Sequence, residues 1–87
     1  MVNRLQVCQC VDRVDLYFVE PNIARGHGRF HVCRSMREAI LVARHYIMHE
    51  NFDKMVEVMP HYESDTSYMH DFSDDTEVIQ AILKYGN

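Results

Sequence analysis

The sequence predicts an α+β fold, a small single domain (residues 1–87) with a largely antiparallel sheet of three to five strands and two helices packed on one face. Apolar residues alternate with a period of two in the first third of the chain, which is typical of strands. Two later segments have a helical apolar period, and each follows a helix-capping pattern. Most strand-like runs precede the first helix, so the expected order is β-β-β-α-β-(β)-α.

The first two strands are expected at residues 4–11 and 14–19. Leu5, Val7 and Val11 share one face of the first run and alternate with polar or small residues, as in a half-buried strand. The break between the two runs is short, which favours a hairpin. A loop is expected at 21–28, followed by a third strand at 30–33 with Phe30 and Val32 facing inward. Three adjacent strands in a meander are the simplest arrangement.

The first helix is predicted to begin after Ser35. Ser35 and Glu38 have the spacing of a capping box, in which each side chain bonds to the backbone amide of the other residue. Positions that share one side of this helix are apolar, so they are expected to face the core. They are Met36, Ala39, Ile40, Ala43, Tyr46 and Ile47.

The second half of the chain is expected to add one or two strands and a closing helix. Residues 54–59 form a strand-like run that Pro60 ends, and a short strand is expected at 66–70. Asp74 is the expected N-cap of a helix at 75–84, and Gly86 is its expected C-cap. The residues of this helix expected to face inward are Val78, Ile79, Ile82 and Tyr85.

Composition indicates a soluble intracellular protein. The sequence contains no apolar run of the roughly 18–20 residues that a membrane span needs, and its first residues lack the apolar stretch of a secretory signal. The three cysteines cannot all pair with one another, which favours a reducing compartment such as the cytoplasm. Motifs of nucleophilic or phosphate-transfer enzymes are missing, so we expect a non-enzymatic protein without a cofactor.

Charge is distributed unevenly along the chain. Residues 1–44 contain seven arginines and four acids, a net charge of +3, whereas residues 45–87 contain two lysines and nine acids, a net charge of −7. Residues 61–77 contain six acids and no lysine or arginine. Tyrosine and phenylalanine are interspersed among these acids. Such a segment is expected to attract a basic surface on another protein, because charge steers the encounter and aromatic side chains supply contact area.

The leading functional hypothesis is therefore a binding or regulatory protein that contacts a basic partner through this segment. One setting for such a protein is a phage- or virus-encoded inhibitor that competes with nucleic acid for a basic groove of a host complex. Leu41, Val42 and Met48 lie off the core side of the first helix and suggest a second contact surface, for instance in a homodimer. The expected partner-binding residues are Glu63, Asp65, Tyr68, Asp71, Phe72, Asp74, Asp75 and Glu77.

Three alternatives rest on other residues. Arginines in and after the 21–28 loop could bind nucleic acid: Arg25, Arg29, Arg34 and Arg37. A zinc site could form if the first and third strands were neighbours, with ligands Cys8, Cys10, His31 and Cys33. His45 and His49 are one helical turn apart, a spacing that can chelate a metal ion.

Overall fold

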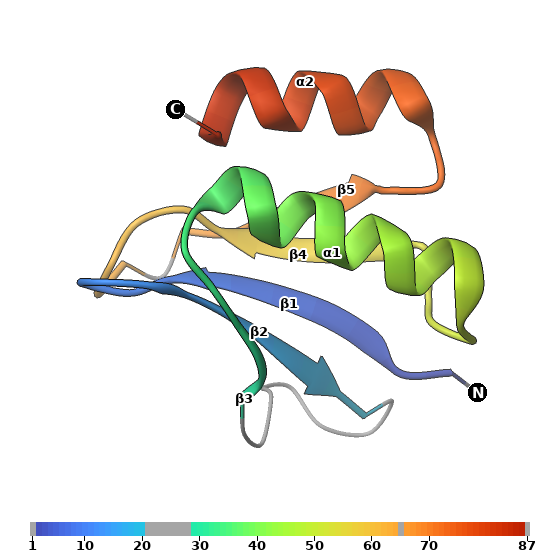
Figure 1. The fold of residues 1–87 in the computed structure, drawn as a ribbon, viewed down its shortest axis with the longest axis horizontal. Helices are drawn as coiled ribbons and strands as arrows, with labels where there is room; N and C mark the ends of the chain where they lie inside the picture. Colours follow the sequence, from blue (N-terminus) through green and yellow to red (C-terminus); the bar gives the residue numbers. More distant parts are fainter. Residues whose placement is uncertain (1, 21–28, 65, 87) are drawn as a thin grey trace.

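The computed structural model describes residues 2–20, 29–64 and 66–86, with backbone only for residues 29 and 30. The elements follow in the order β1 (Arg4–Gln9), β2 (Val14–Val19), β3 (Arg29–Cys33), α1 (Met36–His49), β4 (Met55–Met59), β5 (Tyr68–Asp71) and α2 (Asp75–Tyr85). This order confirms the predicted α+β fold, and both helices lie on one side of the sheet (Figure 1). The predicted loop at 21–28 lies outside the described residues, as does Asp65.

The five strands lie side by side in the order β3-β2-β1-β4-β5. β1, β2 and β3 form the expected antiparallel meander. β1 ends at Gln9, so the prediction that Val11 faces the core is wrong: Val11 lies in the turn after β1 and is 75% exposed. α1 then carries the chain across the sheet, so that β4 pairs with the far side of β1 in parallel, with Val7 opposite Val58. β5 returns antiparallel to β4 at the sheet edge. β1 is therefore the central strand.

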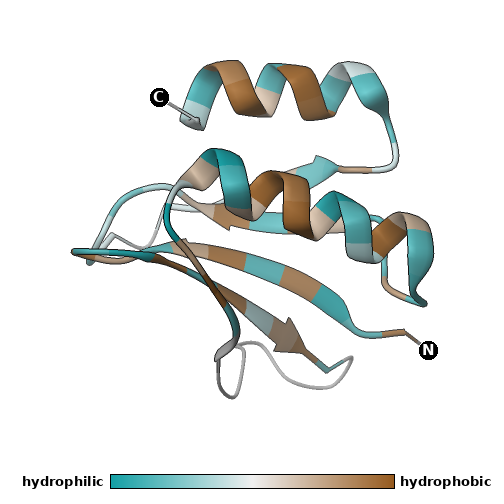
Figure 2. Ribbon diagram, viewed as in Figure 1, coloured by the Kyte–Doolittle hydropathy of each residue, from teal (hydrophilic) through white to brown (hydrophobic). Residues whose placement is uncertain are grey.

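The core lies between the sheet and the helices. From the sheet it contains Leu5, Val7, Val56 and Val58, all fully buried. The predicted core side of α1 is confirmed: four of its residues are buried and the other two, Tyr46 and Ile47, pack partly buried against the same cluster. Hydrophobic bands run along both helices and the central strands (Figure 2). Phe72, just after β5, is the largest fully buried side chain.

The prediction that Val32 faces the core is wrong. Cys33 lies opposite Val14 across the β2–β3 pair, and residues opposite each other point to the same face of a sheet. Cys33 is therefore buried on the helix side, whereas Val32 is 50% exposed on the other side. The register of the β2–β3 pair shifts between Leu16, which lies opposite His31, and Tyr17, which lies opposite Arg29. The side chain of Phe30 lies outside the described part of the structure.

The sheet face that the helices leave uncovered has a buried carboxylate, Asp15, which is 1% exposed. It accepts hydrogen bonds from Arg13 Nε at 2.9 Å and Tyr17 Oη at 3.2 Å, and from Cys10 Sγ at 3.3 Å. Burial alone would raise the pKa of Asp15, but the hydrogen bonds from Arg13, Cys10 and Tyr17 outweigh it, and the pKa lies below its ordinary value. Asp15 is thus held as an anion within the strand.

The helix ends follow the predicted capping residues, but the Glu38 carboxylate accepts from the Arg34 amide at 3.4 Å and not from the Ser35 amide as the capping box predicted. Ser35 Oγ accepts from the Glu38 amide at 3.1 Å, and Asp74 Oδ1 accepts from the Thr76 amide at 2.9 Å. Gly86 ends α2, where its amide donates to the Ile82 carbonyl. A Cβ at this position would lie 2.5 Å from that oxygen, so glycine is required by close approach. Neither described helix combines the length and apolarity that crossing a membrane requires.

Candidate functional site

The acids of the 61–77 segment gather mainly at the start of α2. Asp74 caps the helix, and Asp71 accepts from the amide and hydroxyl of Ser73 at 2.9 and 2.6 Å. These bonds from Ser73 lower the pKa of Asp71. Glu77 accepts from the Asp71 amide at 2.9 Å, and Asp75 forms an ion pair with Arg44 of α1. The cluster Asp71, Asp74, Asp75 and Glu77 therefore helps to fix the turn between β5 and α2.

The aromatic residues of the segment lie elsewhere. Phe72 is fully buried in the core, so its ring is not available to a partner in this state. Tyr68 begins β5, at the opposite end of that strand from Asp71, and its ring lies 4.4 Å from the Lys84 ammonium. Glu63 precedes β5 and is exposed. The structure thus separates the aromatic side chains from the acids with which they alternate in sequence.

The helices instead expose a set of large apolar side chains. Two contacts show how α1 and α2 lie: Arg44 pairs with Asp75 near the start of α2, and a Cβ at Gly86 would lie 3.3 Å from Cβ of Arg37. The two helices are therefore antiparallel (Figure 1). Leu41 falls between Arg37 and Arg44 on α1, and both Ile79 and Leu83 fall between the two contact points on α2. The three side chains line the same stretch of the helix pair.

These side chains remain largely in contact with solvent, although two helices meet there. Leu41 is 46% exposed, Ile79 57% and Leu83 70%, and Met48, two turns after Leu41 on α1, is 55% exposed. We call these four residues the helical face. The prediction that Ile79 faces inward is wrong: the buried residues of α2 are Val78 and Ala81. Apolar clusters exposed in this way commonly mark interaction surfaces.

The helical face has opposite charges at its two ends. Because Asp75 pairs with Arg44, the start of α2 lies beside the last part of α1, and the exposed acids near these two helix ends are Glu50, Asp74 and Asp75. At the other end, the exposed Arg34 and Arg37 flank the start of α1. Arg44 neutralises part of the acidic end through Asp75. A partner is therefore offered an apolar centre with an acidic border at one end and a basic border at the other.

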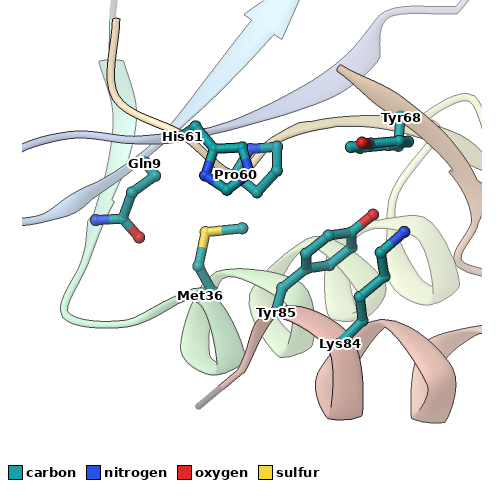
Figure 3. Close-up of a pocket in the computed structure, with 7 residues that line it drawn as sticks. All are labelled: Gln9, Met36, Pro60, His61, Tyr68, Lys84 and Tyr85. Carbon is teal, nitrogen blue, oxygen red and sulfur yellow. The ribbon is translucent and has the colours of Figure 1, made fainter. Parts of the chain in front are cut away.

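A separate pocket of about 450 Å³ lies beneath the end of α2 (Figure 3). Lys84 and two tyrosines give it one cation and two aromatic rings, with the Lys84 ammonium 4.4 Å from the Tyr68 ring centroid and 5.3 Å from that of Tyr85. These groups can hold a planar or anionic molecule but supply no activated nucleophile. The seven lining residues are Gln9, Met36, Pro60, His61, Tyr68, Lys84 and Tyr85.

The side chain of His70, on β5, contacts two residues of α2, one of which, Tyr85, lines this pocket. Its Nε2 lies 2.9 Å from the Tyr85 hydroxyl oxygen, and its Nδ1 lies 3.5 Å from Glu77 Oε1. Burial lowers the pKa of His70 below its ordinary value of 6.5, and the opposing effect of the Glu77 carboxylate is not sufficient to restore it.

We expect an NMR titration of native protein to give His70 a midpoint below 6.5, the ordinary value, and the same residue in urea a midpoint near it. Since folding lowers this pKa, the neutral imidazole contributes stability that is fully present above the unfolded value and is lost as the pH falls through the folded one. A native midpoint at or above that of the unfolded chain would contradict the packing of His70 against Tyr85.

The four residues of the sequence-predicted zinc site do not come together. β2 lies between β1 and β3. Cys8 pairs with Asp15 whereas Cys33 pairs with Val14, the residue just before Asp15, so the two cysteines point to opposite faces of the sheet. Cys8 and Cys10 therefore lie on the uncovered face, and His31 and Cys33 lie on the helix face. Burial raises the pKa of Cys8 to about 12 and that of Cys33 to about 11, so neither thiol is an activated nucleophile.

The residues of the other two alternatives are only partly described. Arg34 and Arg37 are exposed beside the start of α1, whereas Arg25 and the side chain of Arg29 lie outside the described residues. His45 and His49 are both exposed on α1, with ring centroids 4.5 Å apart. No protein-family model, curated protein or solved structure gives a significant match to the chain.

Proposed function

We propose that this is a small non-enzymatic protein that binds another protein through the helical face, Leu41, Met48, Ile79 and Leu83. The observation that carries the proposal is the exposure of these side chains, from 46% to 70%, on two helices whose contacts place three of them along the same stretch. Covering the exposed parts of these side chains is favourable by on the order of 1 kcal/mol or more each. A partner that covers them recovers this free energy.

The acidic end of the helical face favours a partner with basic residues beside its apolar contact. Asp74, Asp75 and Glu50 border the apolar residues, so a lysine or arginine on the partner would meet carboxylates at the rim. This retains the basic partner expected from the sequence and replaces the buried Phe72 by Ile79 and Leu83 as the source of contact area. Inhibition of a complex that handles nucleic acid is one function that the identity of the partner would reveal.

The test compares capture by three versions of the immobilised full chain from a lysate of the cells that make it. Ile79→Ser/Leu83→Ser removes two apolar contacts and is expected to weaken partner binding about 100-fold, because each contact contributes about 1.5 kcal/mol. Val11→Ser is the matched control, since Val11 is 75% exposed in the turn after β1, away from the helices. Capture is quantified for each protein by mass spectrometry.

The proposal requires a protein retained by the wild type and the Val11→Ser control and lost from the double variant. Asp74→Asn/Asp75→Asn should then slow association and reduce its dependence on salt, while the first of these substitutions keeps a side chain that can cap α2. Equal capture by the wild type and the double variant, or no protein enriched by the wild type, would overturn the proposal.

A further inference from the structure

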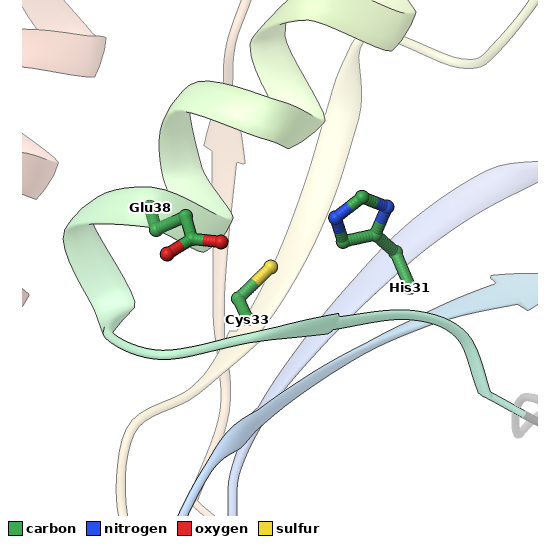
Figure 4. A group of neighbouring side chains, drawn as sticks. All are labelled: His31, Cys33 and Glu38. Carbon is green, nitrogen blue, oxygen red and sulfur yellow. The ribbon is translucent and has the colours of Figure 1, made fainter.

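Three potential metal ligands converge where β3 passes into α1 (Figure 4). His31 and Cys33 are two residues apart on β3, so their side chains share the helix side of the sheet. Glu38 lies in the first turn of α1 and reaches back toward them. A ring nitrogen of His31, the sulfur of Cys33 and a carboxylate oxygen of Glu38 all lie within 4.8 Å of one another.

The backbone around these residues is held in place. β3 is paired to β2, with His31 opposite Leu16 and Cys33 opposite Val14. Glu38 is fixed by the capping interactions of α1: its amide donates to Ser35 Oγ at 3.1 Å, and one of its carboxylate oxygens accepts from the Arg34 amide at 3.4 Å. The fold therefore fixes the backbone of all three residues before any ion is present.

The chemistry of the three groups fits zinc. Imidazole nitrogen, thiolate sulfur and carboxylate oxygen are its usual ligands, and in a tetrahedral site with bonds of about 2.0–2.3 Å they lie about 3.3–3.8 Å apart. Closing from 4.8 Å to such separations requires movements of about 1 Å, which the half-buried side chains of His31 and Glu38 can supply by rotation.

Electrostatics also favour a cation at this point. Cys33 is only 1% exposed, and its sulfur is placed beside a carboxylate rather than among apolar groups alone. In the metal-free protein this sulfur is a neutral thiol, and a divalent ion would bind there by displacing its proton to solvent, so that the thiolate and the carboxylate share one cation.

We propose that His31, Cys33 and Glu38 bind one zinc ion, with water as the fourth ligand. The site is independent of the helical face, because that face could bind a partner with or without metal. It keeps the two β3 residues of the sequence-predicted zinc set and replaces Cys8 and Cys10 by Glu38. The metal would join the edge of the sheet to the first turn of α1.

Cobalt is the probe, because a thiolate bound to Co²⁺ gives a sulfur-to-metal charge-transfer band in the near ultraviolet. The full chain, without an affinity tag, is freed of metal with a chelator, kept reduced, and titrated with Co²⁺ and then Zn²⁺. We expect one equivalent of Co²⁺ to produce the band and one equivalent of Zn²⁺ to remove it.

Variants assign the band to its ligands. Cys33→Ser should abolish it, and Glu38→Gln, which keeps a side-chain oxygen that can accept from the Arg34 amide, should weaken Co²⁺ binding at least about tenfold. Because Cys33 is buried and its replacement can unfold the chain, Glu38→Gln and His31→Gln provide the test in variants whose circular dichroism is that of the wild type. Cys8→Ser/Cys10→Ser and His45→Gln/His49→Gln are the matched controls and should keep the band.

The outcomes separate the alternatives. No charge-transfer band in the wild type overturns the site. A band lost from the Cys8→Ser/Cys10→Ser variant but kept by Glu38→Gln also overturns it, since the ion would then lie on the uncovered face. Cobalt binding without a thiolate band, lost from His45→Gln/His49→Gln, would place the metal on the histidine pair of α1 and exclude the proposed ligands.

Discussion

Phe72→Ala is expected to lower the free energy of unfolding by about 3–5 kcal/mol. Phe72 is the largest fully buried side chain, and its ring stacks on His70 with centroids 5.8 Å apart. Its removal leaves a cavity where β5 meets α2. Since a domain of this size is stable by only about 5–10 kcal/mol, much of the native stability would be lost.

Urea unfolding followed by circular dichroism measures the change. Tyr62→Ala is the matched control, because Tyr62 belongs to the same acidic segment but is 53% exposed, and it should cost less than 1 kcal/mol, about the range of surface changes. Equal midpoints for Phe72→Ala and the wild type would show that Phe72 lies at the surface. It would then return to the set of partner-contact residues.

Asp15→Asn is expected to cost about 2 kcal/mol, because it removes charge-assisted hydrogen bonds within the sheet. The amide cannot accept from both Arg13 and Tyr17 as the carboxylate does, and its own donor group faces the Arg13 guanidinium. The side chain of Arg13 is 39% exposed, so water compensates part of the loss. Asp12→Asn is a close control, since Asp12 pairs with the same Arg13 but is 77% exposed.

The pH dependence of stability tests the same carboxylate. The folded pKa of Asp15 lies below its ordinary value of 3.8, so its contribution is present above that value and is lost as the pH falls through the folded pKa. The thermal unfolding temperature of the wild type should fall below about pH 4, and the fall should be smaller in Asp15→Asn. An Asp12→Asn variant as unstable as Asp15→Asn would contradict the special role of the buried residue.

The sequence predicts the elements of this fold well because their periods are strong. The core side of α1 is unambiguous, since only one set of positions on that helix is consistently apolar. α2 is different, because its apolar residues occupy so wide an arc around the helix that more than one face could be buried. They are Val78, Ile79, Ala81, Ile82 and Leu83. That width was itself a signal that part of α2 would remain exposed.

The candidate sites depended on pairing between strands, which local patterns do not determine. The side to which Cys33 points follows from its partner Val14, and a shift of one residue in that register would exchange Cys33 with Val32. The helix capping role of Glu38 was evident in the sequence, but its closeness to His31 depends on how α1 folds back over the sheet. Phe72 likewise has no periodic neighbours that would mark it as a core residue.

The central position of β1 also determines the order in which the sheet can assemble during synthesis. Its pairing with β2 closes a turn of a few residues, whereas the link between Gln6 and Glu57 joins positions 51 apart in the chain. One edge of β1 is therefore open from the time the hairpin forms until Met55–Met59 has left the ribosome. During that interval the growing chain exposes an unpaired apolar strand, and it is then that the protein is most exposed to aggregation or chaperone binding.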